Sequence, residues 1–115
     1  AKETIISGNE KVLKARFSDA SFFINSDLLI KSSERVKNLK NVTFSEGLGS
    51  LYDRVNRIEW LTKSLTTKLG FTLEDIDKSI KVAHYSKHDL VSNMVDEFPE
   101  LHCIMTHQFP IHDIL

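Results

Sequence analysis

The sequence of 115 residues has one cysteine, four glycines and no long apolar run. Because Cys103 has no second cysteine to pair with, an internal disulfide is excluded and a reducing compartment is expected. We expect its thiol to be buried and inert. Gly47 and Gly49 lie too close together to form a phosphate-cradling loop, and they lack the strand-to-helix context that such a loop needs.

Sequence features that would send the chain into or across a membrane are also missing. No apolar stretch reaches the roughly 20 residues that span a bilayer. Residues 1–6 lack the layout of a signal peptide, so export is not expected. We therefore expect a cytoplasmic protein.

The composition is that of one soluble globular domain, with 41% hydrophobic and 27% charged residues. The net charge of −1 conceals an asymmetry, because residues 1–68 carry a balance of +4 and residues 69–115 a balance of −5. A basic first half could face phosphate groups, which an acidic second half could not do easily. A solvated surface of mixed charge is the alternative interpretation.

The hydrophobic pattern is helical almost throughout and predicts an all-α fold, a compact multi-helix domain over residues 1–115. Ser7 and Glu10 have capping-box spacing, so the first helix should begin near Asn9 and break around residues 25–27. Its inner face is expected to comprise Leu13, Phe17, Ala20 and Ile24. A short second helix, capped by Ser32 or Ser33, should follow with Val36 and Leu39 inside. Residues 41–49 are expected to form a loop or distorted turn, and nothing supports a larger sheet.

The third helix shows the clearest apolar stripe, formed by Leu51, Val55, Ile58, Leu61, Leu65 and Leu69. Gly70 stands where a helix often ends. Two ion pairs at i,i+4 spacing are expected on its outer face, Asp53 with Arg57 and Glu59 with Lys63. Thr72 should cap a fourth helix, with Asp75 as the acid of its capping box. A break is expected near residues 85–86, and Pro99 should end the last helical stretch.

Three segments share their order and spacing with one known family. They are Gly8–Ala20, with the sequence GNEKVLKARFSDA, Leu48–Ile58, with LGSLYDRVNRI, and Ser86–Leu101, with SKHDLVSNMVDEFPEL. Together they resemble an internal stretch of the beta subunit of the bacterial two-subunit glycyl-tRNA synthetase. The family usually continues with Gln-Gly-Ile-Met-Gly, whereas this chain has His102-Cys103-Ile104-Met105-Thr106, so residues 106–115 are expected to be a divergent or foreign tail.

This resemblance implies an internal piece of a subunit several times longer, forming a helical domain related to the HD superfamily. ATP and Mg would be bound by the separate alpha subunit, which activates glycine, and this piece would hold no cofactor and no catalytic residue. Its expected partners are the alpha subunit and glycine tRNA. Its expected role is to support ATP-dependent ligation of glycine to tRNA, either by positioning the tRNA or by bracing neighbouring domains. The alternatives are a divergent HD-type metal-dependent phosphohydrolase and a purely structural spacer.

Three residues raise the question of a metal site. His84 and His88 stand four residues apart on a predicted helix and Asp89 follows, so the three could meet on one face and bind a divalent metal. The His88-Asp89 dipeptide also resembles that of HD-type phosphohydrolases, with Asp96 or Asp113 as the downstream acid. No histidine precedes His84, however, so the distant first ligand of that pattern is missing. We therefore expect a structural or exposed role and no bound metal.

Two basic groups on predicted outer helix faces are candidates for contact with tRNA phosphates. They are Lys11, Lys14 and Arg16 on the first helix, and Arg54, Arg57 and Lys68 on the third. Such contacts depend on salt and carry little base information. The alternative is that both groups lie on solvated faces.

Three aromatic residues, Phe22, Phe23 and Trp60, could stack on unpaired bases. They lie within or beside helical apolar stripes, where aromatic side chains are usually buried. We therefore expect all three to belong to the core.

Overall fold

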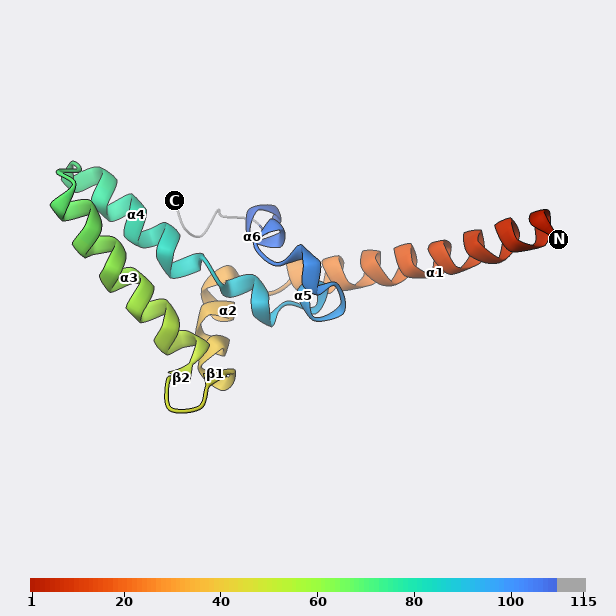
Figure 1. The fold of residues 1–115 in the computed structure, drawn as a ribbon, viewed down its shortest axis with the longest axis horizontal. Coiled ribbons are helices and arrows are strands. Elements are labelled where there is room, and N and C mark those ends of the chain that lie inside the picture. The colour runs from red at the N-terminus through yellow and green to blue at the C-terminus, as the bar shows by residue number, and fades with distance from the viewer. Residues whose placement is uncertain (110–115) are drawn as a thin grey trace.

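The computed structural model describes residues 1–109 and is built almost entirely of helices (Figure 1). The helices are α1 (Lys2–Leu28), α2 (Ser32–Asn38), α3 (Leu51–Lys68), α4 (Leu73–Tyr85), α5 (Asn93–Glu97) and α6 (Ile104–Gln108). Three 3-10 turns are η1 (Leu39–Asn41), η2 (His88–Val91) and η3 (Pro99–Leu101). A small antiparallel pair of strands, β1 (Thr43–Ser45) and β2 (Gly49–Ser50), occupies the predicted loop. The all-α class is confirmed, and the relation to the HD superfamily stays a prediction.

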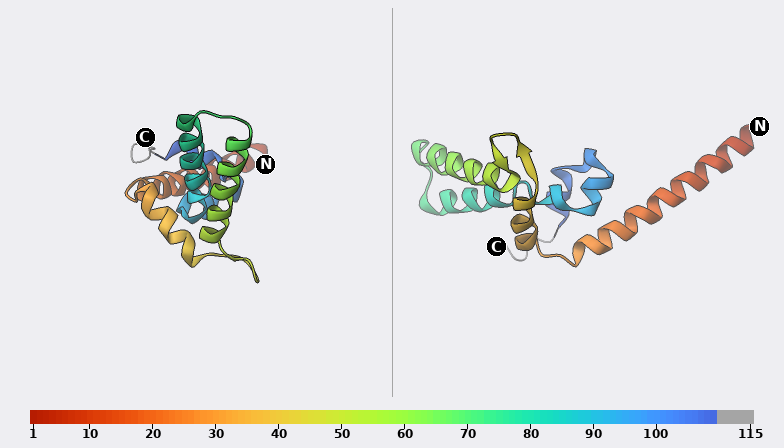
Figure 2. Two further views of the ribbon diagram at one scale, coloured as in Figure 1. Left: turned by 90° about the vertical axis from the view of Figure 1, so that its left-hand side faces the viewer. Right: turned by 90° about the horizontal axis from the view of Figure 1, so that it is seen from below.

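Helix α1 projects from the other elements as a single rod (Figures 1 and 2), and the molecule extends 64 Å along its longest axis against 33 and 27 Å across. The prediction of a start near Asn9 was wrong, because α1 already begins at Lys2. Its N-terminus has no side-chain cap. The break predicted at residues 25–27 lies a few residues later, since α1 runs on to Leu28 and α2 begins at Ser32. Among residues 1–109, no helix is both long and apolar enough to cross a membrane.

The predicted inner face of α1 is correct only near its C-terminal end. Ala20 and Ile24 pack against the core, whereas Leu13 is exposed on the projecting part of the helix and Phe17 is 69% exposed at the edge of the packed part, beside Met94 and Phe98. Close packing is therefore limited to the last turns of α1 and the elements that follow it.

The core consists of two groups of buried side chains joined through Leu90. One group holds Met94, Val95, Met105 and Phe109, and the last turns of α1 pack against it. The other holds Leu39, Leu51 and Val55 at the start of α3. Leu90 of η2 contacts both groups, and the predicted burial of Val36 and Leu39 is confirmed.

Residues near the C-terminal end of the described chain belong to this packing. Met105 lies in α6, and Phe109 directly follows that helix with almost its whole side chain buried. The expected tail at 106–115 therefore begins inside the packed part of the protein. Its last six residues lie outside the described range.

Helices α3 and α4 form an antiparallel hairpin that extends away from α1 (Figures 1 and 2). Its ends follow the predicted local signals. Gly70 has φ +76° directly after the last turn of α3, a conformation that glycine adopts without strain. The Thr72 hydroxyl accepts a hydrogen bond from the Asp75 backbone N–H at 3.2 Å, which confirms the cap of α4.

The expected inner stripe of α3 is buried only in its first turns. Leu51 and Val55 are buried, but Leu61, Leu65 and Leu69 are exposed. Thr66 lies eleven residues, about three turns, after Val55 and is buried on the same face, from which Leu61 and Leu65 are rotated away. The prediction of a continuous buried leucine stripe was therefore wrong.

Neither predicted ion pair of α3 is found among the salt bridges of the described residues. Asp53 instead completes a capping box with Ser50, whose backbone N–H donates to its carboxylate at 2.8 Å. Glu59 contacts His84 across the hairpin. Asp53 and Glu59 therefore bind Ser50 and His84 in place of the basic residues four positions along the helix.

Candidate nucleic-acid interface

The two arginines at the start of α3 are held in place without an acidic partner. The Arg54 guanidinium lies 4.6 Å from the ring centroid of Phe44 in β1, a cation–π contact. Arg57 Nη1 donates to the carbonyl oxygen of Leu48 at 3.1 Å. Because a ring and a carbonyl leave the positive charge in place, Phe44, Arg54 and Arg57 form a fixed cationic surface, which we call the hairpin patch.

Asp53 is an acid of α3 that lies close enough to the hairpin patch to interact with Arg57. Its pKa lies below the ordinary value because the backbone N–H and hydroxyl of Ser50 donate to the carboxylate, and the charge of Arg57 lowers it further. The carboxylate is thus ionised at neutral pH and committed to the cap of α3. Glu46, in the turn between β1 and β2, forms no salt bridge with either arginine among the described residues, so both guanidinium groups remain without a carboxylate partner.

Lys68, the third predicted basic residue of α3, lies in the last turn of the helix. Eleven residues separate it from Arg57, which corresponds to about 16 Å along the helix axis. A lysine at this position interacts favourably with the helix dipole, so it also has a structural explanation. The hairpin patch therefore does not include Lys68.

The basic group on α1 divides into two parts. Arg16 Nη1 lies 2.7 Å from Glu97 Oε1 in α5, and its guanidinium packs 4.6 Å from the centroid of the Phe98 ring. This partner compensates its charge and ties α1 to α5. Lys11 and Lys14 are exposed on the projecting part of the helix.

The expected burial of the aromatic residues is correct for one of the three. Phe23 packs against the core, but Phe22 and Trp60 are 68% and 67% exposed. A helical stripe in the sequence does not reveal which of its faces has a neighbour, so this outcome could not be predicted.

The proposed metal ligands do not converge. His84 lies on α4, where its Nδ1 contacts Glu59 of α3. His88 lies beyond the end of α4, in η2, so the two histidines do not share a helix face as predicted. The Asp89 carboxylate accepts hydrogen bonds from the backbone N–H groups of Cys103, at 2.7 Å, and Thr106, at 3.2 Å. Asp89 therefore caps the start of α6.

His88 is completely buried and its pKa lies below the ordinary value, mainly because burial disfavours the charged ring. The hydrogen bond to the Tyr85 carbonyl oxygen, at 2.6 Å, opposes this effect. Its Nδ1 must donate to that oxygen, which leaves Nε2 buried without a partner. Within residues 1–109, no group of three or more His, Cys, Asp or Glu side chains is placed to hold a metal. Asp96 is exposed on α5, and Asp113 lies outside the described range.

Cys103 was expected to be buried, but it is exposed. Among the described residues it is the only non-glycine residue with positive φ, at +72°. Left-handed backbone costs an ordinary residue about 1–2 kcal/mol. The family pattern quoted above has glycine at this position. The backbone at Cys103 therefore keeps a conformation that suits glycine better than cysteine.

Cys103→Gly is accordingly expected to raise the free energy of unfolding by about 0.5–1 kcal/mol, since relief of strain exceeds the added entropy of the unfolded chain. Urea denaturation followed by circular dichroism measures this change. Cys103→Ala removes the thiol but keeps a Cβ at positive φ, so it should give no such gain. An equal gain for both variants would mean that the thiol, and not the backbone, is responsible.

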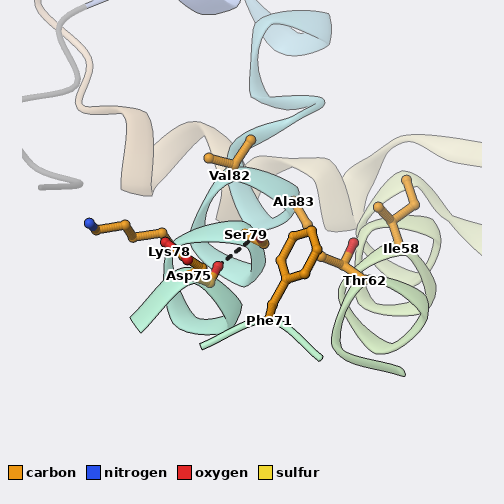
Figure 3. A pocket seen from close by; sticks show the side chains of 8 residues that line it. All are labelled: Ile58, Thr62, Phe71, Asp75, Lys78, Ser79, Val82 and Ala83. Atoms are coloured by element: carbon orange, nitrogen blue, oxygen red, sulfur yellow. Dashed lines mark hydrogen bonds between the residues drawn. The ribbon is translucent and has the colours of Figure 1, made fainter. Parts of the chain in front are cut away.

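An open hollow of about 510 Å³ lies between α3 and α4 (Figure 3). The Phe71 ring and residues of both helices line it. Lys78 pairs with Glu74 at 2.6 Å, and the Ser79 hydroxyl donates to the Asp75 carbonyl oxygen at 2.7 Å. The cation of the hollow is therefore engaged, and the hairpin patch remains the better candidate site.

Comparison with known proteins connects this arrangement to one family. A family model described as glycyl-tRNA synthetase beta subunit matches residues 1–114. The chain is 46% identical over 102 residues to a glycine–tRNA ligase beta subunit of Phenylobacterium zucineum, and 44% identical over 99 residues to that of Halalkalibacterium halodurans. It is 42% identical over 109 residues to that of Bacillus subtilis. These matches cover 86–95% of this chain but only 14–16% of each relative.

Proposed function

The chain belongs to the glycyl-tRNA synthetase beta subunit family, and from this premise we propose that it helps to position glycine tRNA through the hairpin patch. The complete enzyme would attach glycine to its tRNA using ATP and Mg bound by the alpha subunit. This chain would take no part in the chemistry. The observation that carries the proposal is the fixed cationic pair of Arg54 and Arg57.

The geometry of the hairpin patch suits phosphate groups. A guanidinium presents several N–H donors in one plane and can bind phosphate oxygens through two parallel hydrogen bonds. Phe44 and the Leu48 carbonyl restrict the motion of the two side chains, so less entropy is lost when RNA binds. A folded RNA would be recognised here through the shape of its backbone.

The double variant Arg54→Ala and Arg57→Ala is expected to weaken binding of glycine tRNA by about 10- to 50-fold at 0.1 M salt, because two phosphate contacts with counterion release are lost. The slope of log affinity against log salt should fall by about 1.4–1.8. Fluorescence anisotropy of labelled tRNA across a salt series measures both quantities.

The matched control is the double variant Lys78→Ala and Lys81→Ala, which removes the same charge from α4. Both lysines pair with acids of their own helix, Glu74 and Asp77, so affinity should change less than threefold. An equal loss for both double variants would show that overall charge, and not the hairpin patch, controls binding.

A second candidate, bracing of neighbouring domains, is favoured by the projecting part of α1. That part exposes the apolar side chains of Ile5, Ile6, Val12 and Leu13. Such a face is typical of a helix that packs against another surface. If the unchanged chain binds no tRNA at low salt, bracing becomes the better explanation. Phosphohydrolase activity lacks comparable support, because His88 and Asp89 are buried and engaged in holding the chain.

A further inference from the structure

Four residues of α3 follow one another at three-residue spacing: Arg54, Arg57, Trp60 and Lys63. Residues three apart on a helix are neighbours rotated by about 60° from one another, so the four form one inclined ridge across the exposed side of α3, with Arg54 and Lys63 at its two edges. We call this set the α3 ridge. It begins at the hairpin patch and places the indole of Trp60 between two cations.

Both neighbours of Trp60 keep their charge. Arg57 donates to a carbonyl oxygen and not to a carboxylate. Lys63 was expected to pair with Glu59, but Glu59 turns toward His84, and Lys63 has no salt bridge among the described residues. The result is a 67% exposed indole flanked on both sides by positive charge.

We infer that Trp60 is a stacking platform for an unpaired nucleotide of the bound tRNA, with Arg57 and Lys63 on the phosphates at either side. This inference rests on the proposed function. Aromatic side chains in cationic grooves bind single-stranded RNA by stacking on its bases, and this mode tolerates any base. The cations on both sides of the indole favour a polyanion over an apolar protein surface as its partner.

The chain allows a direct test, because Trp60 is its only tryptophan. Glycine tRNA is titrated into the full 115-residue chain while tryptophan fluorescence and the anisotropy of labelled tRNA are recorded together. We expect fluorescence quenching that follows the binding curve. Trp60→Ala should weaken binding about tenfold, since one stacked base is lost, and Trp60→Phe should retain most of the affinity.

Phe22→Ala is the matched control, because Phe22 is as exposed as Trp60 but lies on α1, away from the α3 ridge. Its affinity for tRNA should change less than twofold. A blunt-ended RNA duplex of similar length provides a second control, since it offers phosphates but no unpaired base. It should bind without quenching.

The outcomes separate this inference from the proposed function. Salt-dependent binding without quenching, together with unchanged affinity of Trp60→Ala, would overturn the stacking role and leave phosphate contact by the hairpin patch intact. Equal quenching by the duplex would overturn the stacking role as well. Failure of the unchanged chain to bind tRNA at low salt would overturn both.

Discussion

Asp89→Ala is expected to lower the free energy of unfolding by about 3–5 kcal/mol, a large share of the stability of a domain of this size. The Asp89 side chain is completely buried, and its carboxylate accepts hydrogen bonds from two backbone N–H groups at the start of α6. Alanine would leave both partly buried donors without this partner and would open a cavity where the carboxylate was. His102, whose Nδ1 lies 3.0 Å from the same carboxylate, would lose its contact as well.

Urea denaturation followed by circular dichroism tests this expectation. Asp89→Asn keeps one acceptor oxygen but loses the charge, so it should cost less, about 1–3 kcal/mol. Asp96→Ala removes the same kind of side chain from an exposed position and should stay within about 0.5 kcal/mol of the unchanged protein. If Asp89 were instead a metal ligand, a chelator would destabilise the unchanged protein as strongly as the substitution.

Arg35→Ala is expected to cost about 3–4 kcal/mol, because the substitution removes a large side chain from the core together with its hydrogen bond. Arg35 is almost completely buried and donates to the Asp27 carbonyl oxygen. Its guanidinium lies 3.9 Å from the ring centroid of Phe109. Burial lowers the pKa of Arg35 below its ordinary value, and the charge of Asp27 opposes that shift. The side chain still remains charged, as arginine does in proteins.

Arg35→Met separates volume from charge. Methionine fills much of the same space without a donor, so this variant should lose only about 1–2 kcal/mol. A double-mutant cycle with Asp27→Asn then measures the coupling between the two charges. Denaturant midpoints of the four proteins provide the data. A loss below 1 kcal/mol for Arg35→Ala would contradict a role for this residue in holding α1 to the core.

The parts of the fold that could be predicted depend on neighbours in the sequence. Thr72 caps α4 because its hydroxyl stands three residues before the Asp75 N–H, within reach where a helix begins. Gly70 ends α3 for an equally local reason. Asp27 and Asp89, by contrast, satisfy N–H groups far away in the sequence, since Asp27 accepts from Asn93 and Met94. No periodicity reveals such a partner, and Asp27 was assigned only to a break between helices, which lies a few residues later.

For the candidate site, too, the sequence predicted only what depends on neighbouring residues. The sequence identified Arg16 and Arg57 as equivalent candidates, because both are basic residues on an outer helix face. Their difference arises from partners that tertiary structure brings close, Glu97 for the first and a loop carbonyl for the second. The environment of Trp60 depends on Glu59 in the same way. Composition suggested the class of ligand, and only the packing of the helices distinguished the residues suited to bind it.

In mechanical terms, helix α1 is a beam fixed at one end. Its last turns are anchored by the Arg16–Glu97 ion pair, by the packing of Ile24 and by the buried carboxylate of Asp27. The part before Arg16 overhangs by about 20 Å at 1.5 Å per residue. A tilt of about 10° at the anchored turns would move the tip by about 4 Å at that length. Small repacking around α5 would therefore be amplified into a large displacement at the far end of the helix.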